Sequence, residues 1–250
     1  MAARINRRLV QWRPAAPVLI LPRQPVVSFT FDDFPKSAIA AADIIERLHG
    51  HAGFYASTGF LGRQHPAMGE MFDPESLSDL ALRGHEIGAH THSHIDCAKS
   101  DLAAFQNDMD LNLAMLQQAA CMPPPSSMAY PYGETSHAAK RWTAENFTTG
   151  RGVLPGVNTG LADRAQLRAV ELGASAAHLR RAFAHLESCI RSKGWLIFFT
   201  HDVSSSPSAH GARPDLIEEL GRRACGQGAI LAAPTAAAAL CGIARSLDDE

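Results

Sequence analysis

The chain of 250 residues is long enough for one large α/β domain, and its 46% hydrophobic content supplies a substantial core. Its 23 basic and 25 acidic side chains leave a net charge of -2, which argues against a whole-molecule attraction to nucleic acid or to anionic membranes. The five widely spaced cysteines include no C-x-x-C pair, so they fit reduced thiols better than a disulfide framework or a cysteine zinc site.

Residues 1–25 are interpreted as an N-terminal extension. Its basic start and the apolar run from Val18 to Leu21 resemble a secretion signal, but the run is too short and lies between Pro14 and Pro22. No segment approaches the roughly 18 continuous apolar residues that a membrane span requires. The sequence therefore predicts no membrane span, and we expect a cytoplasmic location.

From Val26 onward, β-rich runs alternate with amphipathic helical stretches. The predicted strands are 26–31, 53–56, 86–89, 128–130, 147–151, 169–172, 195–200 and 229–232, and the predicted helices are 37–48, 74–83, 101–120, 175–193, 214–225 and one from 235. Strands with two apolar faces favour a parallel sheet covered by helices, either a closed barrel or an open doubly wound sheet. We expect one domain over 26–250, with loops at 150–160 and 204–213 as candidate lids.

Two adjacent carboxylates, Asp32 and Asp33, end the first predicted strand. In parallel α/β folds, catalytic groups gather at the carboxyl ends of the strands. Successive residues that leave a strand point in different directions, so one carboxylate can bind a metal while its neighbour faces the substrate. The structural alternative for this pair is a helix N-cap or a turn.

Three histidines in five residues follow the strand at 86–89: His90, His92 and His94. A His-x-x-x-His spacing lets two imidazoles converge on one cation. With Asp33 as a third ligand, the set would be two histidines and one carboxylate, which leaves positions open for water and substrate. A lone histidine is usually structural, but the cluster favours metal binding.

A further histidine, His201, directly follows the apolar strand WLIFFT. Its unperturbed pKa of about 6.5 suits general acid catalysis near neutral pH. Taken alone, the residue is better explained as a core histidine that is hydrogen-bonded to the backbone.

In chain order, the segments TFDD, HTHSH, YPYG and FFTHD are similar to the motif series of the polysaccharide deacetylase family, also called NodB-homology or carbohydrate esterase family 4 enzymes. The resemblance covers about 26–233. It implies a single-domain distorted (β/α) barrel with parallel strands and outer helices. It also implies a divalent metal, most commonly zinc, with cobalt, nickel, iron or manganese as alternatives, that is held by Asp33, His90 and His94.

The resemblance also implies roles in amide hydrolysis. Asp32 would be the general base for the attacking water, and His201 would protonate the leaving amine. The backbone N–H of Tyr132 would bind the oxyanion, a contact that is worth a few kcal/mol in other enzymes. The expected substrate is an N-acetylated amino sugar in a polysaccharide or oligosaccharide, and no nucleic acid partner is expected.

The chain departs from the family pattern at Ala129, where many members carry an arginine that pairs with the catalytic base. Either another cation such as Arg151 replaces it, or the base is tuned differently, and the first interpretation is preferred. The family's aspartate–tryptophan motif has no clear counterpart, with Asp163 and Trp195 as weak candidates.

Three other functions remain open at this point. Relatives of the fold act on formamido sugars or on cyclic amides, and a catalytically inactive carbohydrate- or metal-binding module is the alternative from another class. A nucleotide-binding function is disfavoured because no G-x-G-x-x-G or G-x-x-x-x-G-K-[ST] motif follows a predicted strand.

Overall fold

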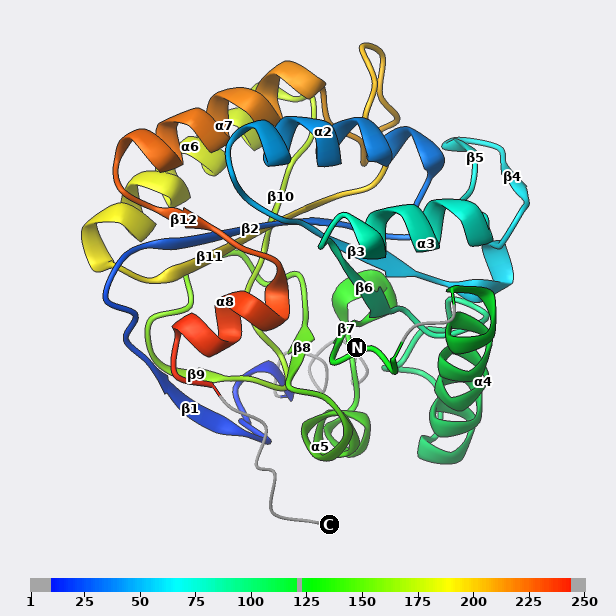
Figure 1. Ribbon diagram of the computed structural model, residues 1–250. Coiled ribbons are helices and arrows are strands. Elements are labelled where there is room, and N and C mark those ends of the chain that lie inside the picture. The colour runs from blue at the N-terminus through cyan, green and yellow to red at the C-terminus, as the bar shows by residue number, and fades with distance from the viewer. Residues whose placement is uncertain (1–9, 121–122, 244–250) are drawn as a thin grey trace.

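The computed structural model describes residues 10–120 and 123–243. Its centre is an eight-stranded sheet in which all strand pairs are parallel, and helices cover its outer side (Figure 1). The strands in order across the sheet are β10 (Val170–Glu171), β11 (Trp195–Thr200), β2 (Val26–Phe31), β3 (Gly53–Ala56), β6 (Glu86–Ala89), β7 (Ser127–Ala129) and β8 (Thr149–Arg151), with β12 (Ile230–Leu231) beside β2.

The sheet curls towards closure. Beyond β8, a parallel bridge joins Arg151 to Leu167, and the chain runs from there into β10 at the opposite edge of the sheet. This arrangement confirms the expected distorted (β/α) barrel with parallel strands and outer helices.

Seven α-helices and three short 3-10 helices (η) connect the strands in the described part of the chain. They are η1 (Lys36–Ala38), α2 (Ile39–Arg47), η2 (Thr58–Phe60), α3 (Pro74–Leu82), α4 (Leu102–Ala120), η3 (Pro131–Gly133), α5 (His137–Asn146), α6 (Ala176–Ser192), α7 (Pro214–Gly226) and α8 (Pro234–Leu240). Two small antiparallel pairs lie outside the barrel sheet: β1 (Pro17–Ile20) with β9 (Gly160–Asp163), and β4 (Gln64–His65) with β5 (Gly69–Glu70).

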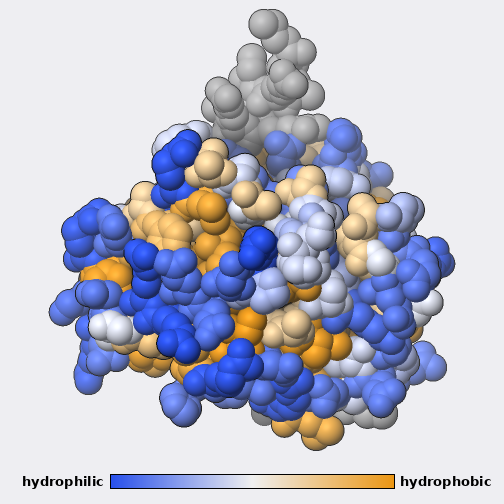
Figure 2. All heavy atoms as spheres, turned by 90° about the horizontal axis from the view of Figure 1, so that it is seen from above, coloured by the Kyte–Doolittle hydropathy of each residue, from blue (hydrophilic) through white to orange (hydrophobic). Residues whose placement is uncertain are grey.

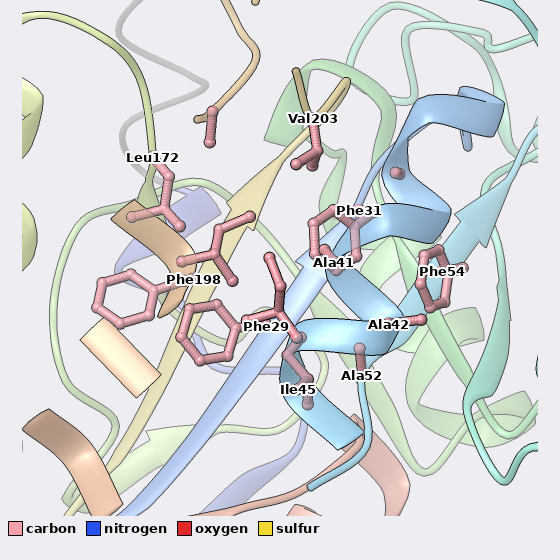
Figure 3. Packing of buried hydrophobic residues seen from close by; sticks show 14 of the residues in the cluster. Phe29, Phe31, Ala41, Ala42, Ile45, Ala52, Phe54, Leu172, Phe198 and Val203 are labelled. Carbon is pink, nitrogen blue, oxygen red and sulfur yellow. The ribbon is translucent and has the colours of Figure 1, made fainter. Parts of the chain in front are cut away.

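Aromatic side chains of the central strands form the main core beneath α2. Phe29 and Phe31 point from β2 towards Ala41 and Ile45 of α2, and Phe198 of β11 lies beside them (Figure 3). The small alanine lets the helix approach the sheet closely, and the phenylalanine rings fill the remaining space. This packing holds β2 and β11 in full register from Trp195 opposite Val26 to Thr200 opposite Phe31.

The predicted strands at 26–31, 53–56, 86–89 and 195–200 are confirmed with the same bounds. Each is a short apolar run, and nearly all of its residues are buried in the structure. Helix α5 was not predicted, because its segment HAAKRWTAEN has few apolar residues at helical spacing. The two small antiparallel pairs were not predicted either, since their strands are only two to four residues long.

Candidate active site

Parallel strands place their carboxyl ends at one edge of the barrel, and this edge collects the predicted site residues. Asp32 and Asp33 follow β2, His90 follows β6, and Arg151 is the last residue of β8. His201 follows β11, which is hydrogen-bonded to β2 along its whole length. The two aspartates and both histidines, far apart in the sequence, therefore line one cavity of about 570 Å³, together with Tyr132 of η3. Arg151 does not line the cavity but contacts Asp32.

The side chains of Asp33, His90 and His94 lie close together at this edge. One potential ligand atom from each lies within 4.8 Å of the others, which suits a shared metal ion. Oδ1 of Asp33 is 3.5 Å from Nε2 of His90 and 3.2 Å from Nε2 of His94. Although buried, this oxygen has no hydrogen bond from any described residue. An unpartnered buried carboxylate oxygen is costly, and a cation at this position would satisfy it.

Both histidines of this group are in the neutral form that a metal ligand requires. Nδ1 of His90 is 2.8 Å from the carbonyl oxygen of Ala129, so Nδ1 carries the proton and the lone pair of Nε2 faces Asp33. Burial lowers the pKa of His90 to about 3 and that of His94 to about 4, so both rings are neutral at pH 7. These three side chains therefore fit a divalent cation that accepts nitrogen and oxygen ligands, such as zinc.

The middle histidine of the motif lies apart from this group. Nδ1 of His92 is 2.9 Å from the hydroxyl oxygen of Thr58, and His92 does not line the cavity. The structure thus separates the outer histidines of HTHSH from the middle one, as the family resemblance implies.

Asp32 pairs with Arg151, whose Nη2 donates a hydrogen bond to Oδ1 of the carboxylate. Both side chains are almost completely buried. Burial is the largest single influence on this carboxyl group and by itself raises its pKa. The positive charge and the hydrogen bond of Arg151, together with His90 and His201, outweigh burial and hold the pKa of Asp32 below its ordinary value. Asp32 is therefore ionised at neutral pH.

Asp33 has the opposite environment, although it is the next residue. Burial and the neighbouring charge of Asp32 raise its pKa to about 7, and the charge of Arg151 offsets only part of this. The pair shows two adjacent carboxylates with divergent pKa values, an arrangement typical of functional sites. Here one carboxylate is held by a guanidinium and the other faces two neutral imidazoles.

Two aromatic rings hold the guanidinium of Arg151 in place. Its central carbon is 5.4 Å from the ring centre of Tyr55 on β3 and 5.0 Å from that of Phe199 on β11. These contacts orient the planar group towards Asp32. Ala129, which stands where many family members carry the arginine, contributes only its carbonyl oxygen to His90.

His201 lies beside the three converging residues. Its Nε2 is 3.9 Å from Oδ2 of Asp33, and its Nδ1 is 3.2 Å from the carbonyl oxygen of His210. A carbonyl oxygen can only accept a hydrogen bond, so Nδ1 carries the proton and Nε2 faces the cavity. Asp163 and Trp195 do not line this cavity; Asp163 pairs with Lys140, and Trp195 donates to Ser28.

The loops of the site contain strained backbone. Five of the seven non-glycine residues with positive φ among the described residues lie in these loops: Asp33, Phe34, Thr91, His94 and Tyr132. Such conformations cost about 1–3 kcal/mol each and cluster at functional sites, where the surrounding structure maintains them. At Tyr132, a φ of 59° turns the backbone while the side chain stays 64% exposed at the cavity and its ring centre lies 4.7 Å from that of His94.

Asn112 supports the histidine loop and was missed in the sequence analysis. Its Oδ1 accepts a hydrogen bond from the backbone N–H of His90, and its Nδ2 is within hydrogen-bonding distance of the carbonyl oxygens of Ala56 and Thr91. A signal was present, because Asn112 lies on the buried stripe of α4 that also contains Phe105, Met109 and Leu116. A polar residue at such a position has to find buried partners.

Comparison with known proteins identifies the family of the chain. The family profile described as "Polysaccharide deacetylase" matches residues 21–148, just over half of the chain. The chain belongs to the polysaccharide deacetylase family. The match includes Asp32, Asp33, His90, His94 and Tyr132.

Solved structures of other proteins share the fold of this chain. A peptidoglycan N-acetylglucosamine deacetylase has a TM-score of 0.61 at 21% identity, and the alignment covers 87% of this chain and 89% of the other. A family 4 acetyl xylan esterase from Clostridium thermocellum, in complex with a cobalt ion, has a TM-score of 0.61 at 20% identity over 88% and 93% of the two chains. A variant of the peptidoglycan deacetylase PdaC from Bacillus subtilis has a TM-score of 0.55 at 17% identity over 88% and 93%.

Proposed function

We propose that this family member hydrolyses the acetyl amide of an N-acetylated amino sugar, with a divalent metal, most readily zinc, held by Asp33, His90 and His94. Cobalt, nickel, iron and manganese are the other candidate metals. The observation that carries the proposal is the buried pair of Asp32 and Arg151 directly beside the three converging ligands. A site that only bound a metal would have no use for an ionised carboxylate next to the ligands.

The metal would supply positive charge that polarises the acyl carbonyl and makes water more acidic. Asp32 then accepts the proton of the attacking water. The ion pair with Arg151 keeps the carboxylate ionised before the reaction, so the base is available at neutral pH. Because Arg151 is packed between two rings, the base also keeps its position as the proton arrives.

The leaving nitrogen departs only when it is protonated, and His201 would supply this proton from Nε2. The hydrogen bond from its Nδ1 to the carbonyl oxygen of His210 orients the ring. The backbone N–H of Tyr132 would donate to the developing oxyanion. Water and the amide are thus converted to acetate and a free amine.

The test is acetate release from a panel of N-acetylated sugars, including chitin oligomers and peptidoglycan fragments, by protein that is loaded with zinc or cobalt. We expect Asp32→Asn to lower kcat/KM by about 10³-fold while the bound metal remains, because general base catalysis typically contributes 10²–10⁴-fold. His94→Ala should lose both metal and activity. His92→Ala is the matched control in the same motif and should retain both.

The alternatives predict different outcomes of the same assay. Release of formate, or ring opening of a cyclic amide without acetate, would move the substrate to those classes while keeping the site. Binding of metal and sugar with no turnover of any substrate would contradict an enzymatic role and favour an inactive module.

A further inference from the structure

The small sheet of β1 and β9 has an apolar face that points to solvent. Leu19 and Leu161 are direct partners across the two strands, so their side chains share one face. They are 63% and 76% exposed, and Leu21, two residues after Leu19, is 65% exposed. The opposite face is already used, because Ile20 is buried in the core cluster and Val18 and Ala162 pack against it.

This face departs from the usual pattern. An antiparallel sheet with one buried face normally exposes polar residues on the other. By contrast, hydrophilic side chains predominate on the surface formed by α2, α6 and α7 (Figure 2). Exposed hydrophobic groups that gather on one small element are a sign of an interaction surface.

The segment before β1 is attached to the same sheet and adds a tryptophan. The backbone N–H groups of Ala15 and Ala16 donate to Asp163 of β9. Lys140 of α5 pairs with Asp163 at 2.8 Å and also donates to the carbonyl oxygens of Val10 and Arg13. Trp12, 73% exposed, therefore sits on a segment that is fixed to the leucine-bearing sheet.

The charges are distributed unevenly along the sequence. The first 31 residues contain five arginines and no aspartate or glutamate, whereas the remaining residues contain 18 basic and 25 acidic side chains. The five are Arg4, Arg7, Arg8, Arg13 and Arg23. The net charge of -2 is thus the sum of a positive charge in the N-terminal segment and a negative charge in the rest of the chain.

From these observations we infer that the face formed by Trp12, Leu19, Leu21 and Leu161 docks on an anionic lipid surface. Tryptophan and leucine enter the boundary between headgroups and acyl chains, and the arginines pair with lipid phosphates. Basic residues near an anionic membrane each strengthen binding by about fivefold, and the combination of apolar and basic groups distinguishes this surface from a simple charge patch. Among the described residues, no helix is long and apolar enough to cross a membrane.

The experiment is co-sedimentation of the full chain with vesicles of phosphatidylglycerol and phosphatidylcholine mixed, against vesicles of phosphatidylcholine alone. We expect binding only to the anionic vesicles, with an affinity that falls as salt rises. The double variant Leu19→Ser/Leu161→Ser should weaken binding at least tenfold. Leu82→Ser/Leu111→Ser changes two other exposed leucines and is the matched control, which should bind as the unaltered chain does.

Sedimentation velocity without lipid and binding to a labelled oligonucleotide complete the test. Equal binding by both double variants, no binding to anionic vesicles, or self-association that only Leu19→Ser/Leu161→Ser abolishes would each overturn the proposal. Preferential binding of the oligonucleotide over the vesicles would do the same. The result does not depend on the proposed function, because neither leucine lines the active-site cavity and acetate release from a soluble sugar should be unchanged.

Discussion

Strand β6 begins at the half-buried Glu86 and is followed by the buried His90, and the polar groups at its two ends have different environments. At the amino end, Oε1 of Glu86 accepts hydrogen bonds from the hydroxyls of Ser127 and Thr235, and Oε2 accepts from the backbone N–H of Thr235. At the carboxyl end, His90 faces Asp33, whose buried Oδ1 has no hydrogen bond from the described residues.

This difference separates a structural carboxylate from a functional one. Partial burial of Glu86 and burial of Asp33 raise the pKa of both carboxyl groups. The fold surrounds Glu86 with donors, so the carboxyl group joins β6, β7 and α8. By contrast, no described residue donates a hydrogen bond to Oδ1 of Asp33. The unsatisfied oxygen lowers the stability of the metal-free protein and remains available to a ligand.

The largest effect is expected at the buried pair of Asp32 and Arg151. Arg151→Met should lower the free energy of unfolding by about 3 kcal/mol at pH 7, because it leaves a buried charge without its partner. The double variant Arg151→Met/Asp32→Asn should recover most of this loss. Urea unfolding of the metal-free protein measures both, and additive effects of the two substitutions would contradict a direct energetic coupling.

A smaller loss of stability is expected at the structural end of β6. Glu86→Ala removes the acceptor for three donors and should lower the free energy of unfolding by about 2 kcal/mol, the cost of unsatisfied buried polar groups. Metal content and activity per folded molecule should stay unchanged. Glu86→Gln, which keeps one acceptor oxygen, should lose less than Glu86→Ala. Loss of metal in either variant would show that the two ends are not independent.

The smallest effect, with the opposite sign, is expected at Asp33. Its pKa in the metal-free folded protein is about 7 against an ordinary 3.8, so its ionised form is disfavoured by folding. The contribution of this group to stability is present below pH 4 and is lost as pH rises to 7. Asp33→Asn should therefore stabilise the metal-free protein by about 1 kcal/mol at pH 8 and have little effect at pH 4.

Thermal unfolding of Asp33→Asn and of the unaltered chain at several pH values, both with chelator present, checks this prediction. Added zinc should reverse the order, because only the unaltered chain gains stability from the bound ion. A variant that is less stable than the unaltered chain at pH 8 without metal would show that Asp33 has a structural role.

Much of the barrel was predictable because its central strands are local signals. β2, β3, β6 and β11 are short apolar runs that end at polar or turn-forming residues, and their bounds agree with the sequence analysis. β1 and β9 could not be found in this way, since each pairs with the other across 140 or more residues of chain, and their core contacts are also distant in sequence. Asn112 was missed because periodicity alone does not show which buried groups a helix faces.

By itself, the sequence determined the order of the strands and helices and the placement of acidic and histidine motifs directly after apolar strands, because periodicity and the chemistry of side chains are local properties. Only the tertiary structure decided which of these residues meet. Arg151 lies 119 residues from Asp32 in sequence, and the curl of the parallel sheet brings the carboxyl ends of β2 and β8 together. The same curl buries both side chains, and burial strengthens the electrostatic attraction between their charges because little water is present to screen it.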